Sequence, residues 1–289
     1  MGVADIIPGV SGGTIAFLMG IYEELIDSLY SFDQRFAGRI LRGRWREAFQ
    51  GTGWRFLLPL FLGILSAVFS LSHLMRCLLQ RYPIPVHAFF FGLILTTVVI
   101  IAQKIKKGDF GKVSVAVISA VAMYRLVGMV PMTTPETWWF LIFSGAVAIC
   151  AMILPGISGA FILLLLGKYE YIITAVSDRN WAVLFLIALG CAVGLLTFVR
   201  FLRWVLHKYH DLALSVLAGL VLGSLRKIWP WKETIHSIIT SHGKVVPVEQ
   251  VNVFPATFSL EIVLVAGLCL LGIGVGILLS RVDGRVTKA

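Results

Sequence analysis

The chain has 289 residues, of which 58% are hydrophobic and 14% are charged, and its mean hydropathy is +0.90. A soluble domain carries about 25% charged residues, so the composition excludes one and indicates an integral membrane protein. The formal net charge is +10, but the basic residues lie between apolar runs. They form no stripe interleaved with aromatic residues, so the sequence predicts no nucleic-acid partner.

Eight apolar segments follow one another along the chain. Two of them, residues 1–30 and 138–176, contain a Pro-Gly-x-Ser-Gly element in the middle, where a continuous helix is hard to maintain. The other six have the length and composition of ordinary membrane spans, at 56–79, 85–103, 112–130, 181–200, 212–226 and 258–280. The sequence therefore predicts an all-α polytopic membrane protein with two broken helical segments.

The two broken segments are similar in sequence. Residues 7–12, Ile-Pro-Gly-Val-Ser-Gly, match residues 154–159, Leu-Pro-Gly-Ile-Ser-Gly, at an offset of 155 − 8 = 147. The Gly-x-Tyr-Glu of residues 20–23 matches that of 167–170 at the same offset. Such self-similarity indicates an internal duplication.

A second stretch repeats at an offset of 127, which pairs Gly63 with Gly190 and Gly92 with Gly219. The difference of 147 − 127 = 20 residues corresponds to an Arg-rich loop over residues 31–55 in the first half. The duplication therefore spans most of the chain.

The predicted organisation is a first repeat over 1–134 and a second repeat over 135–289. Each repeat would hold one broken segment followed by three spans. If the broken segments turn back as hairpins, each repeat has three full spans, an odd number, so the two repeats would have inverted topology. Short segments interrupted by Gly and Pro, in matching positions of two halves, are typical of the substrate site of a transporter. The pattern therefore favours transport.

The broken segments either cross the membrane or turn back as re-entrant hairpins, and the Lys and Arg counts do not decide between the two. We favour hairpins, because the backbone groups freed at each break must face protein or a wet cavity. Both arrangements place the loop 31–55 in the cytoplasm of a cell-membrane protein. They differ over residues 226–257, which the hairpin arrangement places on the side opposite that loop and the full-crossing arrangement places on the same side.

A helix that restarts after a Pro-Gly break has N–H groups without intrahelical partners, and these attract anions. Two arginines, Arg76 and Arg203, correspond at the offset of 127 and suit a phosphate. The alternatives are close helix packing for the glycines and snorkelling to the interface for the arginines. The candidate phosphate-binding residues are Ser11, Gly12, Gly13, Thr14, Ser158, Gly159, Arg76 and Arg203. The predicted helix breaks are Pro8, Gly9, Pro155 and Gly156.

Three carboxylates lie inside apolar segments. Because burying a charged side chain in a membrane is costly, each of them is a candidate for a specific role. Glu23 and Glu170 are candidates for coupling or gating, or they reach the interface. Asp5 is a further candidate for coupling, or it caps the helix restart. His207 and His210 have no evident third ligand, so no metal site is predicted. No catalytic motif or cofactor motif occurs, so the sequence predicts no enzyme.

The paired motifs resemble the DUF368 family of PopT-like polyprenyl-phosphate transporters. The resemblance covers essentially the whole chain. It rests on Asp-Ile-Ile-Pro-Gly-Val-Ser-Gly-Gly-Thr-Ile at 5–15, Gly-Ile-Tyr-Glu at 20–23 and Leu-Pro-Gly-Ile-Ser-Gly at 154–159. The family motif marks Asp5, Pro8, Gly9, Ser11, Gly12, Gly13, Thr14, Tyr22, Glu23, Pro155, Gly156, Ser158, Gly159, Tyr169 and Glu170.

The resemblance implies a translocase that returns undecaprenyl phosphate, the lipid carrier of peptidoglycan and other envelope polymers, to the cytoplasmic leaflet. The implied partners are this polyprenyl phosphate and the surrounding membrane lipids. Two alternatives stay open: a small-anion channel or exchanger, since helix N-termini select anions in general, and a membrane-embedded lipid phosphatase.

The chain departs from the family pattern in two places. The second motif has Ala160 and Phe161 where the first has Gly13 and Thr14, so we expect an asymmetric anion site. Family members resemble one another in an apolar stretch before the first motif, whereas seven residues precede Pro8 here. We therefore expect the native N-terminus to lie further upstream.

Overall fold

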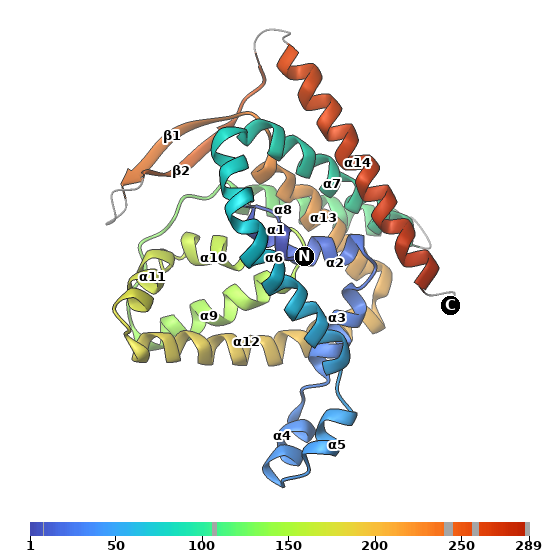
Figure 1. Cartoon of the computed structure of the whole chain (residues 1–289), viewed down its shortest axis with the longest axis vertical. Helices are drawn as coiled ribbons and strands as arrows, with labels where there is room; N and C mark the ends of the chain where they lie inside the picture. Colours follow the sequence, from blue (N-terminus) through green and yellow to red (C-terminus); the bar gives the residue numbers. More distant parts are fainter. Residues whose placement is uncertain (8, 106–108, 240–244, 256–259, 287–289) are drawn as a thin grey trace.

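The structure is a computed structural model that describes residues 1–7, 9–105, 109–239, 245–255 and 260–286. Figure 1 shows a mostly helical molecule with one β-hairpin at its edge. The helices of the first half are α1 (Gly2–Ile6), α2 (Gly12–Leu18), α3 (Tyr22–Tyr30), α4 (Gln34–Leu41), α5 (Trp45–Gln50), α6 (Trp54–Arg81), α7 (Pro83–Lys104) and α8 (Phe110–Val127). The second half has α9 (Trp138–Ile153), α10 (Gly159–Leu165), α11 (Tyr169–Ser177), α12 (Trp181–Lys208), α13 (His210–Ile228), β1 (Lys232–Ile239), β2 (Val245–Asn252) and α14 (Leu260–Val286).

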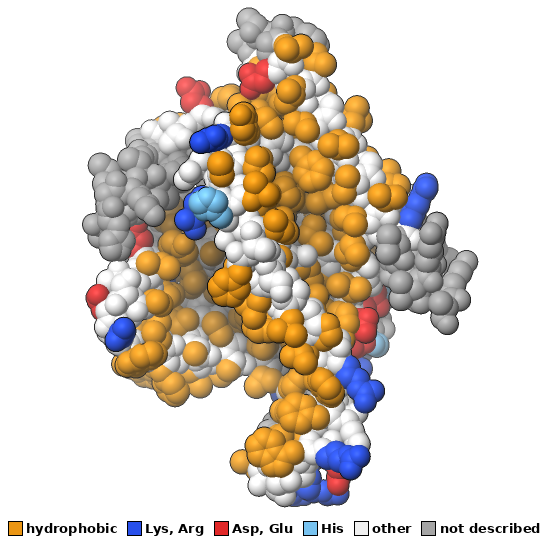
Figure 2. Space-filling model, viewed as in Figure 1, with side chains coloured by type: hydrophobic (Ala, Val, Ile, Leu, Met, Phe, Trp, Pro, Cys, Tyr) orange, Lys and Arg blue, Asp and Glu red, His pale blue; other side chains and the backbone are white. Residues whose placement is uncertain are grey.

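The six predicted spans are all helices, so the predicted all-α polytopic class is confirmed. Helices α6, α7, α8, α12 and α14 are long and apolar enough to cross a membrane. The sixth predicted span, 212–226, lies within α13. At a rise of 1.5 Å per residue, the 28 residues of α6 extend about 42 Å, which exceeds the ~30 Å hydrocarbon core. Figure 2 shows apolar side chains over α6, α12 and α14, as lipid contact requires.

The helix bounds recur at the two offsets found in the sequence. Helices α2 and α10 both begin and end 147 residues apart, since 159 − 12 = 147 and 165 − 18 = 147. Helices α6 and α12 both begin and end 127 residues apart, since 181 − 54 = 127 and 208 − 81 = 127. Matching bounds are what a duplication requires, and the common origin of the two halves stays a prediction.

Long helices of one half pack parallel to long helices of the other half, α7 with α14 and α8 with α13. Close approach needs glycine at two corresponding positions: Gly92 of α7 packs on the carbonyl of Cys269 in α14, and Gly219 of α13 packs on the carbonyl of Ala116 in α8. Without a side chain at these points, the backbones come together as small residues allow in membranes. The last long helix of each half is therefore packed against the other half.

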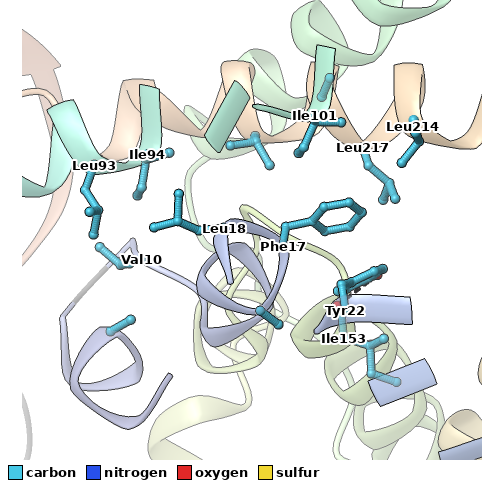
Figure 3. Packing of buried hydrophobic residues seen from close by; sticks show 14 of the residues in the cluster. Val10, Phe17, Leu18, Tyr22, Leu93, Ile94, Ile101, Ile153, Leu214 and Leu217 are labelled. Atoms are coloured by element: carbon cyan, nitrogen blue, oxygen red, sulfur yellow. Dashed lines mark hydrogen bonds between the residues drawn. The ribbon is translucent and has the colours of Figure 1, made fainter. Parts of the chain in front are cut away.

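Corresponding helices run in opposite directions. The ring of Phe91, near the start of α7, lies 5.6 Å from that of Trp229, just after the end of α13. At the other end of the pair, Ile101 of α7 lies beside Leu217 and Leu214 of α13 (Figure 3). Helices α7 and α13 are thus antiparallel, which is the geometry that inverted repeats would have.

The second broken segment turns back on itself. Leu141 near the start of α9, Ala175 near the end of α11 and Val183 at the start of α12 form one buried cluster, so both ends of the segment lie together. Between them, α10 packs back against α9, where a Cβ at Gly159 would lie 2.8 Å from the carbonyl oxygen of Ala148. Helices α10 and α11 then bend by 105°. This is the shape of the predicted hairpin.

The Arg-rich loop and the β-hairpin lie on opposite sides of the molecule (Figure 1). Lys112 and Asp211 form a 2.6 Å ion pair that joins the starts of α8 and α13, and Asp27 of α3 pairs with Arg203 near the end of α12. The loop with α4 and α5 follows α3 on this side, and Figure 2 shows Lys and Arg gathered over it. The β-hairpin lies on the opposite side, a position that the hairpin arrangement predicts for residues 226–257. Its two strands were not predicted from the sequence, which indicated helices alone.

Candidate functional site

The first break lies between α1 and α2. Gly9 has φ = +92°, a left-handed conformation that favours glycine. Pro8, the other predicted residue of this break, lies outside the described residues. Ser11 then caps α2, because its hydroxyl oxygen accepts a 3.2 Å hydrogen bond from the N–H of Gly13. The break therefore ends in an ordinary side-chain cap.

The start of α2 is also capped by a carboxylate. The N–H of Gly12 donates a 2.7 Å hydrogen bond to Oδ1 of Asp5, and the N–H of Thr14 donates to the carbonyl of Ser11. The sequence predicted that these N–H groups would be free for an anion, but in the structure they have partners within the chain. Asp5 takes the capping role that was one of its two expected roles.

The second break differs from the first. Gly156 has φ = +87°, and Pro155 precedes it. Ser158 stands at the N-cap of α10, but its side chain forms no capping hydrogen bond. Met152, at the position that corresponds to Asp5, is exposed. Helix α10 thus begins without the two caps of α2, which is the asymmetry that the sequence predicted.

The two breaks meet at the centre of the molecule. The hydroxyl of Thr14 accepts a 2.9 Å hydrogen bond from the N–H of Gly156, and the hydroxyl of Ser11 donates to the carbonyl of Leu154 at 3.4 Å. The hydroxyl of Tyr22 donates to the carbonyl of Ile153 at 3.3 Å. Polar side chains of the first segment therefore satisfy the backbone that the second break leaves unpaired.

Apolar packing holds this crossing in place. Figure 3 shows Phe17 and Leu18 of α2 directed toward α7 and α13, and Tyr22 beside Ile153. The rings of Phe17 and Tyr22 lie 4.1 Å apart, and both side chains are buried. Tyr169, which corresponds to Tyr22 at the offset of 147, is 41% exposed, so the two halves use this motif tyrosine differently.

Helix α13 runs along both breaks. A Cβ at Gly9 would lie 2.6 Å from Cγ of Lys227, and a Cβ at Gly156 would lie 2.9 Å from the hydroxyl of Ser224. The ammonium of Lys227 extends to the ring of Phe161 in α10, 4.9 Å from its centre. Lys227 is not among the predicted site residues, since nothing in its spacing along the sequence relates it to either motif.

The two candidate arginines lie away from the breaks. Arg203 forms a 2.5 Å ion pair with Asp27 and lies 4.2 Å from the ring centre of Tyr30. Arg76 is exposed on α6. The structure thus joins neither arginine directly to Ser11 or Ser158.

The candidate coupling carboxylates also separate. Glu23 lies 4.0 Å from Nδ1 of His210, in a pocket that Asp27, His207 and Asp211 also line. Glu170 is exposed on α11, at the other side of the molecule. Within the described residues, no group of three His, Cys, Asp or Glu side chains is placed to hold a metal ion.

Several membrane-length helices surround two broken segments whose breaks meet at the centre. That architecture is typical of secondary transporters, whose substrate sites are built from discontinuous helices. The model of the VCA0040-like family, described as undecaprenyl phosphate translocase-like, matches residues 1–246. The chain belongs to this family, which confirms the resemblance found in the sequence.

Two curated relatives carry the name polyprenyl-phosphate transporter. The protein of Vibrio cholerae is 41% identical over 263 residues, which cover 89% of this chain and 84% of the relative. The protein of Staphylococcus aureus is 31% identical over 249 residues, which cover 80% of this chain and 83% of the relative. No solved structure matches the chain.

Proposed function

We propose that this protein is a translocase of undecaprenyl phosphate that returns the lipid carrier to the cytoplasmic leaflet of the cell membrane. It is a transporter and not an enzyme. Family membership and the names of both relatives support this substrate class. The Arg-rich loop 31–55 would face the cytoplasm, in keeping with the excess of basic residues on that side of membrane proteins.

The observation that carries the proposal is the hydrogen-bonded crossing of the two breaks. Thr14 with Gly156, Ser11 with Leu154 and Tyr22 with Ile153 join two polar backbone segments in an otherwise apolar core. Non-helical backbone at such depth is tolerated only where it is buried in protein or lines a wet cavity. A phosphate head group that crosses the membrane between two inverted halves would pass this point.

In this proposal the two breaks make unequal contributions to a phosphate site. Ser158 and Gly159 belong to the start of α10, which lacks a side-chain cap, and offer donors directly. Ser11, Gly12, Gly13 and Thr14 are engaged within the chain. The N–H of Gly12 would become available when the head group displaces the carboxylate of Asp5, so Asp5 is the proposed coupling carboxylate at this site.

Transport of labelled undecaprenyl phosphate into proteoliposomes, with a pH gradient imposed in either direction, tests the proposal. We expect transport by the wild type and at least tenfold slower transport by Ser11→Ala/Ser158→Ala. The matched control is Ser114→Ala/Ser177→Ala, because both hydroxyls bond only to their own helices on the surface.

The outcomes separate the alternatives. Transport of inorganic phosphate without transport of the lipid would favour the small-anion exchanger. Release of phosphate from the lipid by the pure protein would favour the phosphatase. Equal rates for the wild type and the Ser11→Ala/Ser158→Ala variant would refute the site assignment and leave the substrate class standing.

A further inference from the structure

A small basic pocket lies where α8, α10, α13 and the β-hairpin meet. Its volume is about 70 Å³, which is room for a few water molecules or one small anion. The polar side chains that line it are Arg226 and Lys227 at the end of α13, Lys232 at the start of β1, and Gln250 and Asn252 of β2. No carboxylate is among its lining residues, so the pocket has one sign of charge.

Each of the three cationic side chains contacts a neutral partner. Arg226 donates a 2.9 Å hydrogen bond to the carbonyl of Tyr124, and its guanidinium lies 4.4 Å from the centre of that ring. Lys232 donates to the carbonyl of Lys227. The ammonium of Lys227 lies over the ring of Phe161. Among the described residues, none of the three forms an ion pair.

Like charges gathered in a partly buried pocket repel one another, and each also loses hydration. Burial, together with Lys227 and Arg226, lowers the pKa of Lys232 to about 7. A surface cluster would disperse its long side chains into solvent, whereas here the strand pair and α13 hold them in place. An anion in the pocket would offset this repulsion and favour the protonated form of Lys232.

The remaining wall of the pocket is apolar. It consists of Val127, Met129, Val130, Phe161, Leu164 and Leu165. A free phosphate ion gains nothing from such a wall, whereas the first isoprene unit of a lipid phosphate would bury apolar area against it. The pairing of cations with apolar side chains therefore fits an amphiphilic phosphate.

The pocket adjoins the proposed path of the head group. The stem of Lys227 packs against Gly9 of the first break, and its ammonium reaches α10, which begins at the second break. The β-hairpin places the pocket on the side opposite the Arg-rich loop. An anion held there would be separated from the crossing of the two breaks by the side chain of Lys227.

We propose that Arg226, Lys227 and Lys232 form an outward-facing docking site for the phosphomonoester head group of the lipid, before it reaches the breaks. This proposal rests on the proposed function, because it names the site where that substrate is first bound. Gln250 and Asn252 supply further hydrogen-bond donors from β2. The docking site is separate from the serines of the two breaks.

Binding to the full chain in nanodiscs tests the docking site apart from transport. The probes are farnesyl phosphate, farnesol and inorganic phosphate, each titrated against the wild type by calorimetry. We expect farnesyl phosphate to bind at least tenfold more tightly than either of the other two. The variant Lys227→Gln/Lys232→Gln should weaken farnesyl phosphate binding at least tenfold. The control Lys104→Gln, an exposed lysine at the end of α7 on the opposite side, should bind like the wild type.

Several results would overturn the proposal. Equal affinity of the Lys227→Gln/Lys232→Gln variant and the wild type for farnesyl phosphate would show that the head group docks elsewhere. Equal affinity of the wild type for inorganic phosphate and farnesyl phosphate would show that the pocket recognises free phosphate and not the lipid. The single variant Arg226→Gln gives an independent check, since we expect it also to weaken binding. A wild type that binds farnesyl phosphate through these lysines but transports no lipid would uphold the docking site and refute the translocase.

Discussion

The N–H of Gly156 donates a 2.9 Å hydrogen bond to the hydroxyl of Thr14, a residue 142 positions earlier in the chain. Both residues are buried, and each stands in one of the two broken segments. A buried N–H at a helix break must find a partner, and here its acceptor is a side chain of the other broken segment. The first segment thus supplies an acceptor for the backbone of the second.

We predict that Thr14→Val destabilises the protein by about 1–3 kcal/mol, because the N–H of Gly156 is left buried without a partner. Thermal unfolding in detergent measures the change. Thr14→Ser keeps the hydroxyl and should recover most of the loss. Thr197→Val removes a hydroxyl that bonds only within α12 and should be close to neutral. Full stability of Thr14→Val together with a loss in Thr14→Ser would assign the role of this residue to packing of its methyl group.

Gly156 itself should tolerate no side chain. Its φ of +87° disfavours L-residues, and a Cβ would lie 3.1 Å from the carbonyl oxygen of Leu220. We predict that Gly156→Ala costs at least ~1–2 kcal/mol in stability. Gly274→Ala, where a Cβ meets nothing within 4 Å on α14, should be neutral or stabilising by up to ~1 kcal/mol. The difference in unfolding temperature between the two variants checks the prediction, and similar values would contradict it.

The spans and the breaks could be predicted from the sequence because each depends on local chemistry. Apolar runs of membrane length define α6 and α7 whatever their neighbours are, and Pro-Gly interrupts a helix at 155–156 in any context. The repeated motifs could also be found from the sequence alone, because both of them match at a single offset. These features follow from short windows of sequence.

The partners of the motif residues could not be predicted in this way. Asp5 caps α2 only because α1 folds back toward it, and Lys227 meets Gly9 only because α13 packs along the first break. Arg203 corresponds to Arg76 in the sequence, but in the structure Arg203 forms an ion pair with Asp27 of α3. In each case the decisive contact joins segments that no periodicity connects.

Arg203 and Arg76 allow a test of the symmetry that the sequence suggested. The pair of Arg203 with Asp27 is largely exposed, so we expect Arg203→Ala to cost about 1 kcal/mol or less in stability. If both arginines guide the phosphate, Arg203→Ala and Arg76→Ala each slow lipid transport several-fold in proteoliposomes. Asp27→Asn removes the partner and keeps the cation, so its transport should stay near that of the wild type. Loss of transport in Asp27→Asn with full transport in Arg76→Ala would make Arg203 a structural residue of α12.

The stability of the ligand-free protein should depend on pH through Lys232. The pKa of this lysine is lowered from 10.5 to about 7 by burial and by the nearby charges of Lys227 and Arg226, and His87 of α7 faces the same group. Between these two values the unfolded chain binds more protons than the folded one, so stability should rise as the pH increases from about 7 toward 10. Unfolding temperatures in detergent at pH 6, 7, 8 and 9 measure this slope.

Lys232→Gln should flatten the slope and raise the stability at pH 7, whereas Lys104→Gln should retain the slope. Farnesyl phosphate should flatten the slope, because its negative charge favours the protonated lysine and its stabilising effect should fall as the pH rises above 7. A slope that is the same in the wild type and in Lys232→Gln would show that this lysine stays hydrated and charged.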